Sequence, residues 1–219
     1  MAQTPRLPDS PNPADISDDG RLFAPSAQRN MAHISEIVVA QAPTSGQALE
    51  IASGTGEHLC HFASQCPSVR WTPSDPDPIR RRSIAAHATH LGLSNVAPAL
   101  ALDAAQPGWS THHGEQDLIV LVNLLHLIST PQAKTILEEI AKALTPSGVF
   151  VLYGPFLRDG QTTSEGDARF DAILRAQDPA TGYKDITDVL RWLTEAGLSV
   201  QDPIKMPANN LCIISQNQI

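Results

Sequence analysis

The sequence predicts an α/β fold built on a mostly parallel sheet with helices on both faces. Apolar runs alternate along the chain with segments of helical periodicity, which is the pattern of a parallel sheet. Residues 118–122 are all apolar, as expected for a central strand covered on both sides. Residues 49–58 form a strand end, a glycine turn with Gly54 and Gly56, and the start of a helix.

The composition is that of one globular domain. The chain has 219 residues, of which 42% are hydrophobic, enough for a sizeable core. Its 15 basic and 23 acidic residues give a formal net charge of −8. This charge argues against a phosphate-neutralising surface and therefore against DNA as a partner, although net charge alone leaves RNA or a protein open as substrate.

Cysteine usage and hydropathy exclude several other classes. Cys60, Cys66 and Cys212 form neither a Cys-x-x-Cys pair nor an even framework, so we expect no disulfide scaffold and no metal. No apolar run approaches the roughly 20 residues of a membrane span, and the N-terminus lacks an apolar core behind a basic start. The expectation is a soluble cytoplasmic protein, a monomer or homodimer, that binds a small molecule and no membrane.

The first half of the chain is divided by prolines and glycines. Residues 1–20, rich in Pro, Asp and Ser, predict a flexible arm, and residues 21–219 predict a single domain. Ser26 and Asp77 each stand where they can cap a helix. The expected elements are a helix over 26–40, a strand over 47–52, a helix over 57–65, a strand over 69–72, a helix over 78–91 and a strand over 96–102.

The second half continues the alternation and then breaks it. Turn residues without a period fill 154–166, and a segment of this length at the crevice end of a sheet is usually functional, so we expect a lid over about 157–184. The expected elements are a strand over 118–122, a helix over 131–144, a strand over 149–153, a helix through Phe170 and Leu174, a helix over 186–196, and an antiparallel pair of edge strands over 198–203 and 211–215.

The glycine turn predicts a cofactor cradle, because only glycine lets backbone N–H groups come so close to a ligand. The dinucleotide fingerprint requires a third glycine where this chain has Leu59. Glu50, four residues before Gly54, could bind an amino group, and S-adenosylmethionine carries one. The turn resembles the first motif of class I methyltransferases, with Ala52 in place of the first glycine; a tight turn without a ligand is the alternative. The expected cradle comprises Glu50, Ala52, Ser53, Gly54, Thr55, Gly56 and His58.

Further cofactor contacts are expected where the following strands end. Asp75, with Pro76 beside it, stands 21 residues after Gly54, where an acidic residue receives the ribose hydroxyls; Asp77 competes for this role. Asp103 could accept a hydrogen bond from the adenine amino group, with Ala104 offering its N–H, or it could only cap the next turn. Arg29, Asn30, Asn123 and Leu124 complete the expected set.

Acceptor chemistry is expected at the ends of two later strands. His126 is the candidate base, or a histidine bonded to backbone. Tyr153, the other candidate catalytic residue, could face the sulfonium or an aromatic acceptor, or could cap the core at the end of its strand. An acceptor under the lid would contact Phe156, Arg158, Thr163, Ser164 and Arg175, with Tyr183 near them. The alternative for most polar lid residues is that they are solvated or hold the lid together.

With these residues in hand, the chain resembles the DUF938 group of class I S-adenosylmethionine-dependent methyltransferase-like proteins, which includes the methyltransferase-like 26 proteins of animals. The similarity runs from about Arg21 to Gln216. Where the family pattern leads us to expect a Ser-Asn step, this chain has Gly166-Asp167. The markers are Phe23-Ala-Pro-Ser-Ala-Gln-Arg29-Asn30, Glu50-Ile-Ala-Ser-Gly-Thr-Gly56-Glu-His58, Pro73-Ser-Asp75, Tyr153-Gly-Pro-Phe156, Phe170-Asp171 with Leu174-Arg175, and Met206-Pro-Ala-Asn-Asn210.

The resemblance implies a Rossmann-like class I methyltransferase fold with seven strands, an antiparallel edge strand and S-adenosylmethionine as cofactor. The first hypothesis is methyl transfer to an O, S or N nucleophile of a small molecule. The second is a scaffold or interaction protein of the same fold that holds the cofactor without turnover. A nicotinamide oxidoreductase ranks third because of Leu59.

Overall fold

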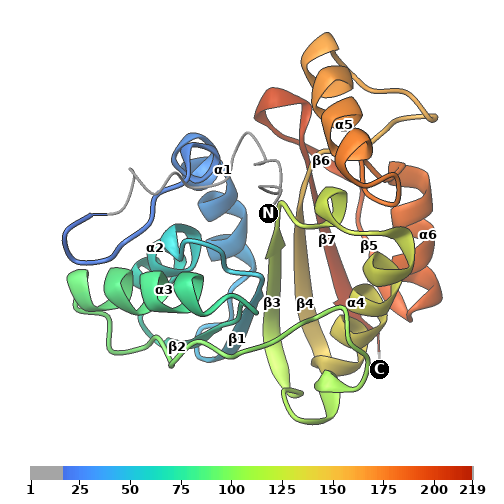
Figure 1. The fold of residues 1–219 in the computed structure, drawn as a ribbon. Helices are drawn as coiled ribbons and strands as arrows, with labels where there is room; N and C mark the ends of the chain where they lie inside the picture. Colours follow the sequence, from blue (N-terminus) through green and yellow to red (C-terminus); the bar gives the residue numbers. More distant parts are fainter. Residues whose placement is uncertain (1–16, 219) are drawn as a thin grey trace.

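The computed structural model describes residues 17–218, which form one seven-stranded sheet (Figure 1). The order is β2-β1-β3-β4-β7-β5, and β6 pairs with β7. Strands β2, β1, β3 and β4 are parallel, whereas β7 runs antiparallel to its neighbours, which confirms the predicted sheet. The strands are β1 (Gly46–Ile51), β2 (Val69–Pro73), β3 (Gln116–Val122), β4 (Leu144–Gly154), β5 (Leu198–Val200), β6 (Ile204–Lys205) and β7 (Leu211–Asn217).

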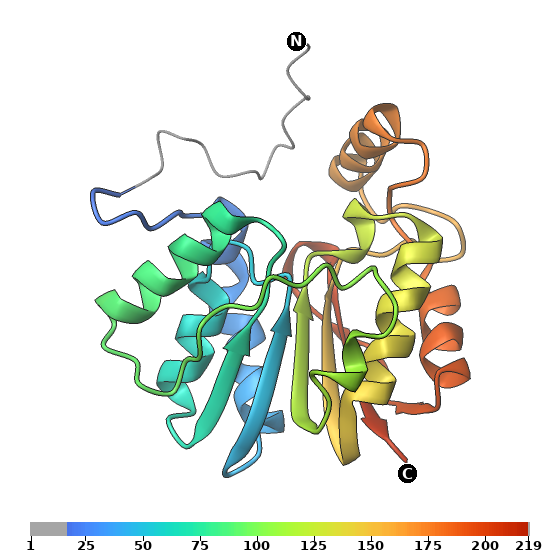
Figure 2. The ribbon, with the colours of Figure 1, turned by 60° about the horizontal axis from the view of Figure 1, so that its bottom comes forward.

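Helices cover both faces of the sheet, so each face has its own core. Ile34, Phe62 and Trp71 belong to one buried cluster, and Ile136 and Leu193 belong to the other. Figure 2 shows α2 and α3 on one side of the strands and α4 and α6 on the other. The helices are α1 (Pro25–Gln41), α2 (Glu57–Gln65), α3 (Pro78–His90), α4 (Thr130–Ala143), α5 (Glu165–Gln177) and α6 (Ile186–Glu195), with the short 3-10 helices η2 (Trp109–Thr111), η3 (Leu125–Leu127) and η4 (Pro207–Asn209).

Local sequence explains where several helices begin. The Asp77 carboxylate accepts a hydrogen bond from Ile79 N at 2.8 Å, which confirms Asp77 as an N-cap ahead of a first-turn proline. Ser129 and Gln132 form a capping box at the start of α4. Asp185 caps α6 in the same way as Asp77 caps α3, so short local motifs set the starts of α3, α4 and α6.

The strand predicted over 96–102 is wrong. This segment runs beside β2 but makes only two isolated bridges, Trp71 to Val96 and Ser74 to Leu100. Ala97 N bonds to the O atom of Trp71, and the next bond of this kind runs from Leu100 N to the O atom of Pro73. Between these two bonds the segment advances by three residues, whereas β2 advances by two. The pairing of the segment with β2 therefore shifts by one residue around Pro98.

The end of the chain forms three strands where two were predicted. The pair over 198–203 and 211–215 is antiparallel as expected, but its first member divides into β5 and the two-residue β6. Strand β7 lies between β4 and β5 rather than at the edge. The irregular segment predicted after β4 is confirmed, and it leads to α5, which stands beyond the carboxyl end of the parallel strands in Figure 1.

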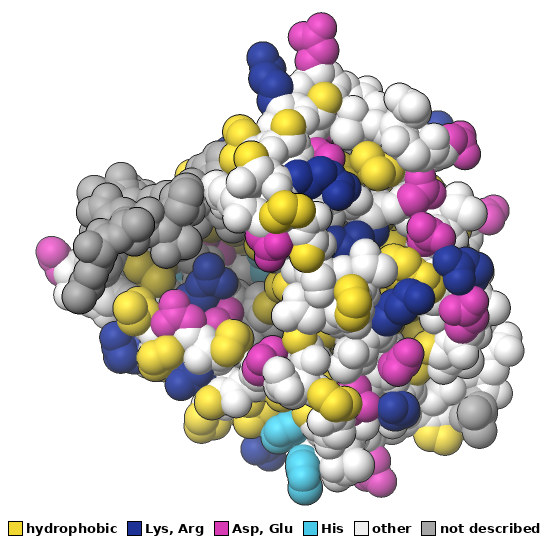
Figure 3. All heavy atoms as spheres, turned by 45° about the vertical axis from the view of Figure 1, so that its right-hand side comes forward, with side chains coloured by type: hydrophobic (Ala, Val, Ile, Leu, Met, Phe, Trp, Pro, Cys, Tyr) yellow, Lys and Arg dark blue, Asp and Glu magenta, His cyan; other side chains and the backbone are white. Residues whose placement is uncertain are grey.

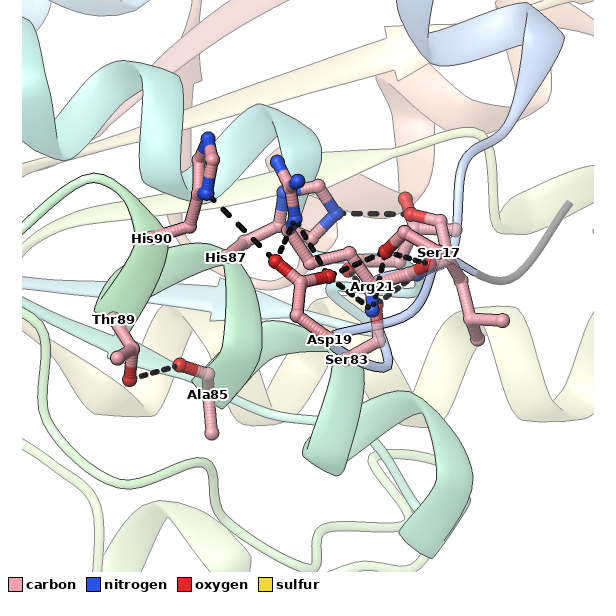
Figure 4. Close-up of polar contacts among 10 residues, drawn as sticks. Ser17, Asp19, Arg21, Ser83, Ala85, His87, Thr89 and His90 are labelled. Atoms are coloured by element: carbon pink, nitrogen blue, oxygen red, sulfur yellow. Dashed lines mark hydrogen bonds and ion pairs between the residues drawn. The ribbon is translucent and has the colours of Figure 1, made fainter.

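The segment before α1 is bound to α3 (Figure 4). Ser83 Oγ accepts from Leu22 N at 2.9 Å and donates to the O atom of Thr55 at 2.7 Å. His87 Nε2 contacts the O atom of Leu22 at 2.9 Å. Ser83 thus links the segment before α1 to the glycine turn. Most of the predicted arm, residues 1–16, lies outside the described residues.

The surface of the described chain carries charges of both signs. In Figure 3, Lys and Arg side chains alternate with Asp and Glu over the face that comes forward. None of the helices between residues 17 and 218 combines the length and the apolar character needed to cross a bilayer. All three cysteines are buried and free, and within this range no group of three His, Cys, Asp or Glu residues is placed to hold a metal ion.

Candidate functional site

A cavity of about 630 Å³ opens at the carboxyl ends of β1, β3 and β4. Open parallel sheets bind ligands at this edge, and ligand pockets of about 300–1,000 Å³ are usual. Residues from α1, the glycine turn, the exits of β3 and β4, the lid and the turn at η4 form its wall. The predicted site residues on the wall are Arg29, Asn30, Glu50, Ala52, Ser53, Gly54, Thr55, His58, Asn123, His126 and Tyr153.

The two glycines of the turn have different functions. Gly54 has φ +58°, and a Cβ added there would meet only the O atom of Ala52, at 3.9 Å, so it would point into open space. A Cβ on Gly56 would lie 2.8 Å from Ile84 Cα, because α3 packs against this end of α2. Ala52 also has positive φ, 54°, which fits its position as a substitute for glycine. Gly54 therefore keeps the cradle open, while Gly56 permits helix packing.

Glu50 is a buried acid on the cavity wall. It is 2% exposed, and its Oε2 atom has no hydrogen-bond partner in the described chain. Burial raises the pKa of Glu50 to about 8, a hydrogen bond from Ser53 opposes this rise, and the charge of Asp75 adds to it. An unpartnered buried carboxyl oxygen is costly unless a ligand donor satisfies it. The arrangement fits a ligand with an amino group.

Asp75 braces the glycine turn from outside the cavity wall. It is 1% exposed and accepts hydrogen bonds from Gly54 N at 3.0 Å and Asp77 N at 2.9 Å. Arg80 lies 3.7 Å from it and itself lines the cavity. The ribose role of Asp75 stays a prediction, as does that of the adjacent Pro76. Arg80 was not among the predicted site residues. It belongs to a run of three arginines, residues 80–82, and this run does not by itself indicate where in the fold its side chains lie.

Asp103 and Ala104 also lie outside the cavity wall. The exposed Asp103 carboxylate accepts from Ala105 N at 3.1 Å and from Gln106 Nε2 at 3.3 Å. The O atom of Ala104 accepts from Trp109 Nε1 at 3.1 Å. These contacts are those of the turn cap that was the alternative for Asp103. The adenine contacts proposed for this pair stay predictions, and so does a contact by Leu124, which packs against the core.

Two hydrogen-bonded pairs of side chains lie beside the cradle: one joins α1 to α2, and the other joins β4 to the residue that follows η4. His58 Nε2 lies 2.7 Å from Asn30 Oδ1, and burial, with the charge of His61, lowers the pKa of His58 to about 4. The neutral ring therefore donates through Nε2. Tyr153 is 1% exposed, and its hydroxyl accepts from Asn210 Nδ2 at 2.9 Å. Burial raises the pKa of Tyr153, so the phenol keeps its proton.

His126 is an uncharged ring in an aromatic group. Its centroid lies 5.8 Å from that of Phe170 and 5.9 Å from that of Tyr183. Burial and the charge of Lys184 lower the pKa of His126 to about 3, against the opposing charge of Asp171. A ring with so low a pKa is a weak proton acceptor at neutral pH. The predicted base role is untested, and this environment does not favour it.

The five residues predicted to bind an acceptor lie off the cavity wall. Phe156 is buried in the core, and Arg158 donates to the O atom of Asn209. Thr163 and Ser164 donate to Asp167, and Arg175 pairs with Asp171. All five therefore hold the lid or the core together. The lid residues on the wall are Asp167, Phe170 and Tyr183; the first two stand three apart on α5, a spacing that could have revealed a shared face.

Comparison with known families identifies the chain. Residues 21–217 match the family described as "Protein of unknown function (DUF938)". The chain belongs to the DUF938 family. This DUF938 protein also matches solved structures of methyltransferases over most of its length, as the resemblance in sequence implied.

Three of these structures show the extent of the likeness. An O-methyltransferase family protein from Burkholderia thailandensis matches with a TM-score of 0.76 and 17% identity, over 88% of this chain and 56% of that chain. An O-methyltransferase family 2 protein from Planctomyces limnophilus in complex with apigenin gives 0.72 and 19%, over 88% and 60%. PigF with SAH gives 0.70 and 19%, over 87% and 56%.

These likenesses establish the fold of the DUF938 protein. Structural similarity at a sequence identity below 25% shows a shared fold but not a shared activity, since one fold hosts many functions. The chain spans only 56–60% of the length of these three proteins. The DUF938 protein shares its architecture, a Rossmann-like α/β fold, with these methyltransferase structures.

Proposed function

We propose that this protein is an S-adenosylmethionine-dependent methyltransferase that acts on a small-molecule acceptor. The observation that carries the proposal is Glu50, whose Oε2 atom is buried, unpartnered in the described chain and on the wall of the cavity. A carboxyl group in this state fits the amino group of the cofactor. The open space at Gly54 gives room for the ligand to approach the backbone.

The described residues can hold the cofactor from several sides. Glu50 would bind its amino group, and Arg29 and Asn30 on α1 line the same cavity. When bound, S-adenosylmethionine supplies an electrophilic methyl group on a sulfonium. Displacement at that methyl needs an acceptor aligned at about 3–3.5 Å, so most of the catalysis can come from positioning.

Binding of S-adenosylhomocysteine (SAH) to Gly54→Val tests the cradle by isothermal titration calorimetry. A valine there fills the open space in front of the turn, so we expect binding to fall below detection. Gly92→Val is the matched control, because Gly92 also has positive φ, 64°, and open space around it, but lies at the end of α3. We expect Gly92→Val to bind SAH like the wild type. Equal affinity in the wild type and Gly54→Val would refute the cradle.

A protein that holds the cofactor without turnover is the second candidate. It is favoured by the state of His126, because a ring with a pKa of about 3 is a weak base at neutral pH. Transfer of labelled methyl to a panel of thiols, phenols, amines and carboxylates separates the two candidates. A labelled product identifies an enzyme, whereas SAH binding without any labelled product supports the binding protein.

A further inference from the structure

The part of the cavity wall that comes from η3, the lid and the turn at η4 has a distinct chemistry. We call it the acceptor wall and define it as His126, Asp167, Phe170, Tyr183, Pro207 and Asn210. Its members meet through direct contacts: the rings of Phe170 and Tyr183 lie 6.2 Å apart, and Asn209, next to Asn210, donates to Asp167 at 3.3 Å. The remaining acidic and basic wall residues, Arg29, Glu50 and Arg80, belong to α1, β1 and α3.

Three rings form the apolar part of the acceptor wall. Phe170 and Tyr183 are close to perpendicular, at 71°, and His126 contacts both at 60–69°. Since burial and the charge of Lys184 keep His126 neutral, this group of rings presents no positive charge to a ligand. It can pack against an apolar or aromatic group and can stabilise a cation over a ring face.

Asp167 supplies the one carboxylate of the acceptor wall. Its Oδ2 atom accepts from Thr163 Oγ1 at 2.8 Å and Ser164 Oγ at 2.7 Å, which fixes the side chain at the start of α5. Among residues 17–218, its Oδ1 atom has only a long contact of 3.4 Å from the Tyr183 hydroxyl. A carboxylate held by one oxygen can accept a further hydrogen bond through the other. It is suited to an N–H donor or a positive charge.

The acceptor wall distinguishes between nucleophiles. A hydroxyl that attacks a methyl sulfonium must lose its proton, and the neighbouring His126 is a weak base. A neutral amine needs no base: its lone pair forms the N–C bond, the C–S bond breaks with its electron pair going to sulfur, and the positive charge passes from sulfur to nitrogen. A carboxylate and ring faces stabilise the charge that develops on nitrogen in the transition state.

We propose that the acceptor wall selects a small molecule with a neutral amine nitrogen next to an apolar or aromatic group, which becomes a methylammonium, with Asp167 as the residue that determines specificity. This inference rests on the proposed methyltransferase function. The amine keeps its hydrogens in the transfer step, and Asp167 binds the product cation. Negatively charged acceptors are repelled by the same side chain.

Calorimetry on the full chain saturated with SAH tests this selection without requiring turnover. The probes are 2-phenylethylamine, which is protonated at neutral pH and so mimics the charge that develops on nitrogen, 2-phenylethanol and 3-phenylpropanoate; they share the aromatic group and differ in the polar end. We expect the amine to bind at least about tenfold more tightly than the alcohol, and the carboxylate most weakly, since a charge-assisted hydrogen bond is worth that factor. An amine that binds no more tightly than the alcohol, or shows no binding, would overturn the proposal.

The ratio of amine affinity to alcohol affinity separates a specific role of Asp167 in binding from a general loosening of the lid. Asp167→Asn should reduce this ratio about tenfold while SAH affinity holds. Asp171→Asn is the matched control: Asp171 lies on the same helix, bonds to Arg175 and Tyr183 N, and is absent from the wall, so it can loosen the lid but should preserve the ratio. An unchanged ratio in Asp167→Asn, or an equal loss in Asp171→Asn, would overturn the role of Asp167. Absence of SAH binding to the wild type would instead refute the proposed function.

Discussion

Glu50→Gln should make the protein more stable and less able to bind its cofactor. The substitution keeps the shape of the side chain and removes its titration. The pKa of Glu50 is raised from 4.5 to about 8 in the folded protein, so between these values the folded chain holds a proton that the unfolded chain releases. Glu50 therefore contributes most to stability below pH 4.5, and this contribution falls as the pH rises towards 8.

The magnitude follows from the width of that pH window. Each pH unit within it costs about 1.4 kcal/mol of unfolding free energy. From pH 5 to pH 7, the free energy of unfolding of Glu50→Gln should therefore rise by about 3 kcal/mol relative to the wild type. Urea denaturation at several pH values measures this difference. A difference that stays constant with pH would refute the account of a buried, unpartnered carboxyl group.

Glu139→Gln is the control for the loss of a buried carboxylate. Glu139 accepts from Ser110 N and Ser110 Oγ at 3.1 and 2.8 Å and pairs with Lys142 at 2.9 Å. Although burial opposes it, these donors lower the pKa of Glu139 to about 2. Its replacement should destabilise the protein at pH 7, since charged hydrogen bonds contribute about 1.5–3 kcal/mol. Stabilisation by Glu50→Gln alone would mark Glu50 as a binding residue that costs stability.

Cofactor binding gives Glu50 a second readout. An ammonium group beside the carboxyl favours its ionised form, so binding should release a proton, and SAH affinity should rise from pH 6 towards pH 8. Glu50→Gln should lower the affinity about tenfold or more at pH 7.5 and remove that rise. Calorimetry in two buffers with different ionisation enthalpies measures the released proton. Equal proton release in the variant would exclude Glu50 as its source.

Two further substitutions separate support of the turn from contact with the ligand. Gly56→Ala should destabilise the fold by about 2 kcal/mol, because its Cβ would lie 2.8 Å from Ile84 Cα; an unchanged thermal midpoint would contradict that packing. Asp75→Ala should weaken SAH binding by about 1–3 kcal/mol, both through the ribose role and through the lost bond to Gly54 N. Calorimetry with homocysteine, which lacks the adenosine of SAH, distinguishes these causes. Only the lost bond to Gly54 N would also weaken the binding of a ligand without ribose.

Local signals in the sequence predict the parts of the fold that depend on them. The apolar run of β3 implies a buried central strand, and Asp77 ahead of a proline implies a helix start; both are present. The glycine turn predicts the cradle, since positive φ and close approach require glycine. These features need no knowledge of distant residues, and the structure places the cradle residues Glu50 and Gly54 on one cavity wall.

Features that depend on distant residues are not visible in the sequence. The slip around Pro98 depends on how residues 96–102 align with β2, which hydropathy does not encode. Asp75 follows its strand as expected, yet its side chain turns to Gly54 N and Asp77 N, a choice made by backbone donors in the folded turn. Arg158, Thr163, Ser164 and Arg175 were candidates for acceptor contacts, but their hydrogen bonds match the alternative, that most polar lid residues hold the lid together.

The acceptor wall shows the same limit. Asp167 and Phe170 lie on one face of α5, but only the path of the lid brings that face to His126. The uncharged state of His126 also depends on Lys184, which is 58 residues away and donates to the O atom of Ile128 at 2.6 Å. Neither relation has a motif that could reveal it.

A crystal structure of the protein with SAH bound tests the central claim most directly. We predict that the ligand fills the cavity above Gly54, with its amino nitrogen within hydrogen-bond distance of Glu50 Oε2 and its sulfur facing the acceptor wall. SAH bound elsewhere on the molecule, or in this cavity with its amino group turned away from Glu50, would contradict the account.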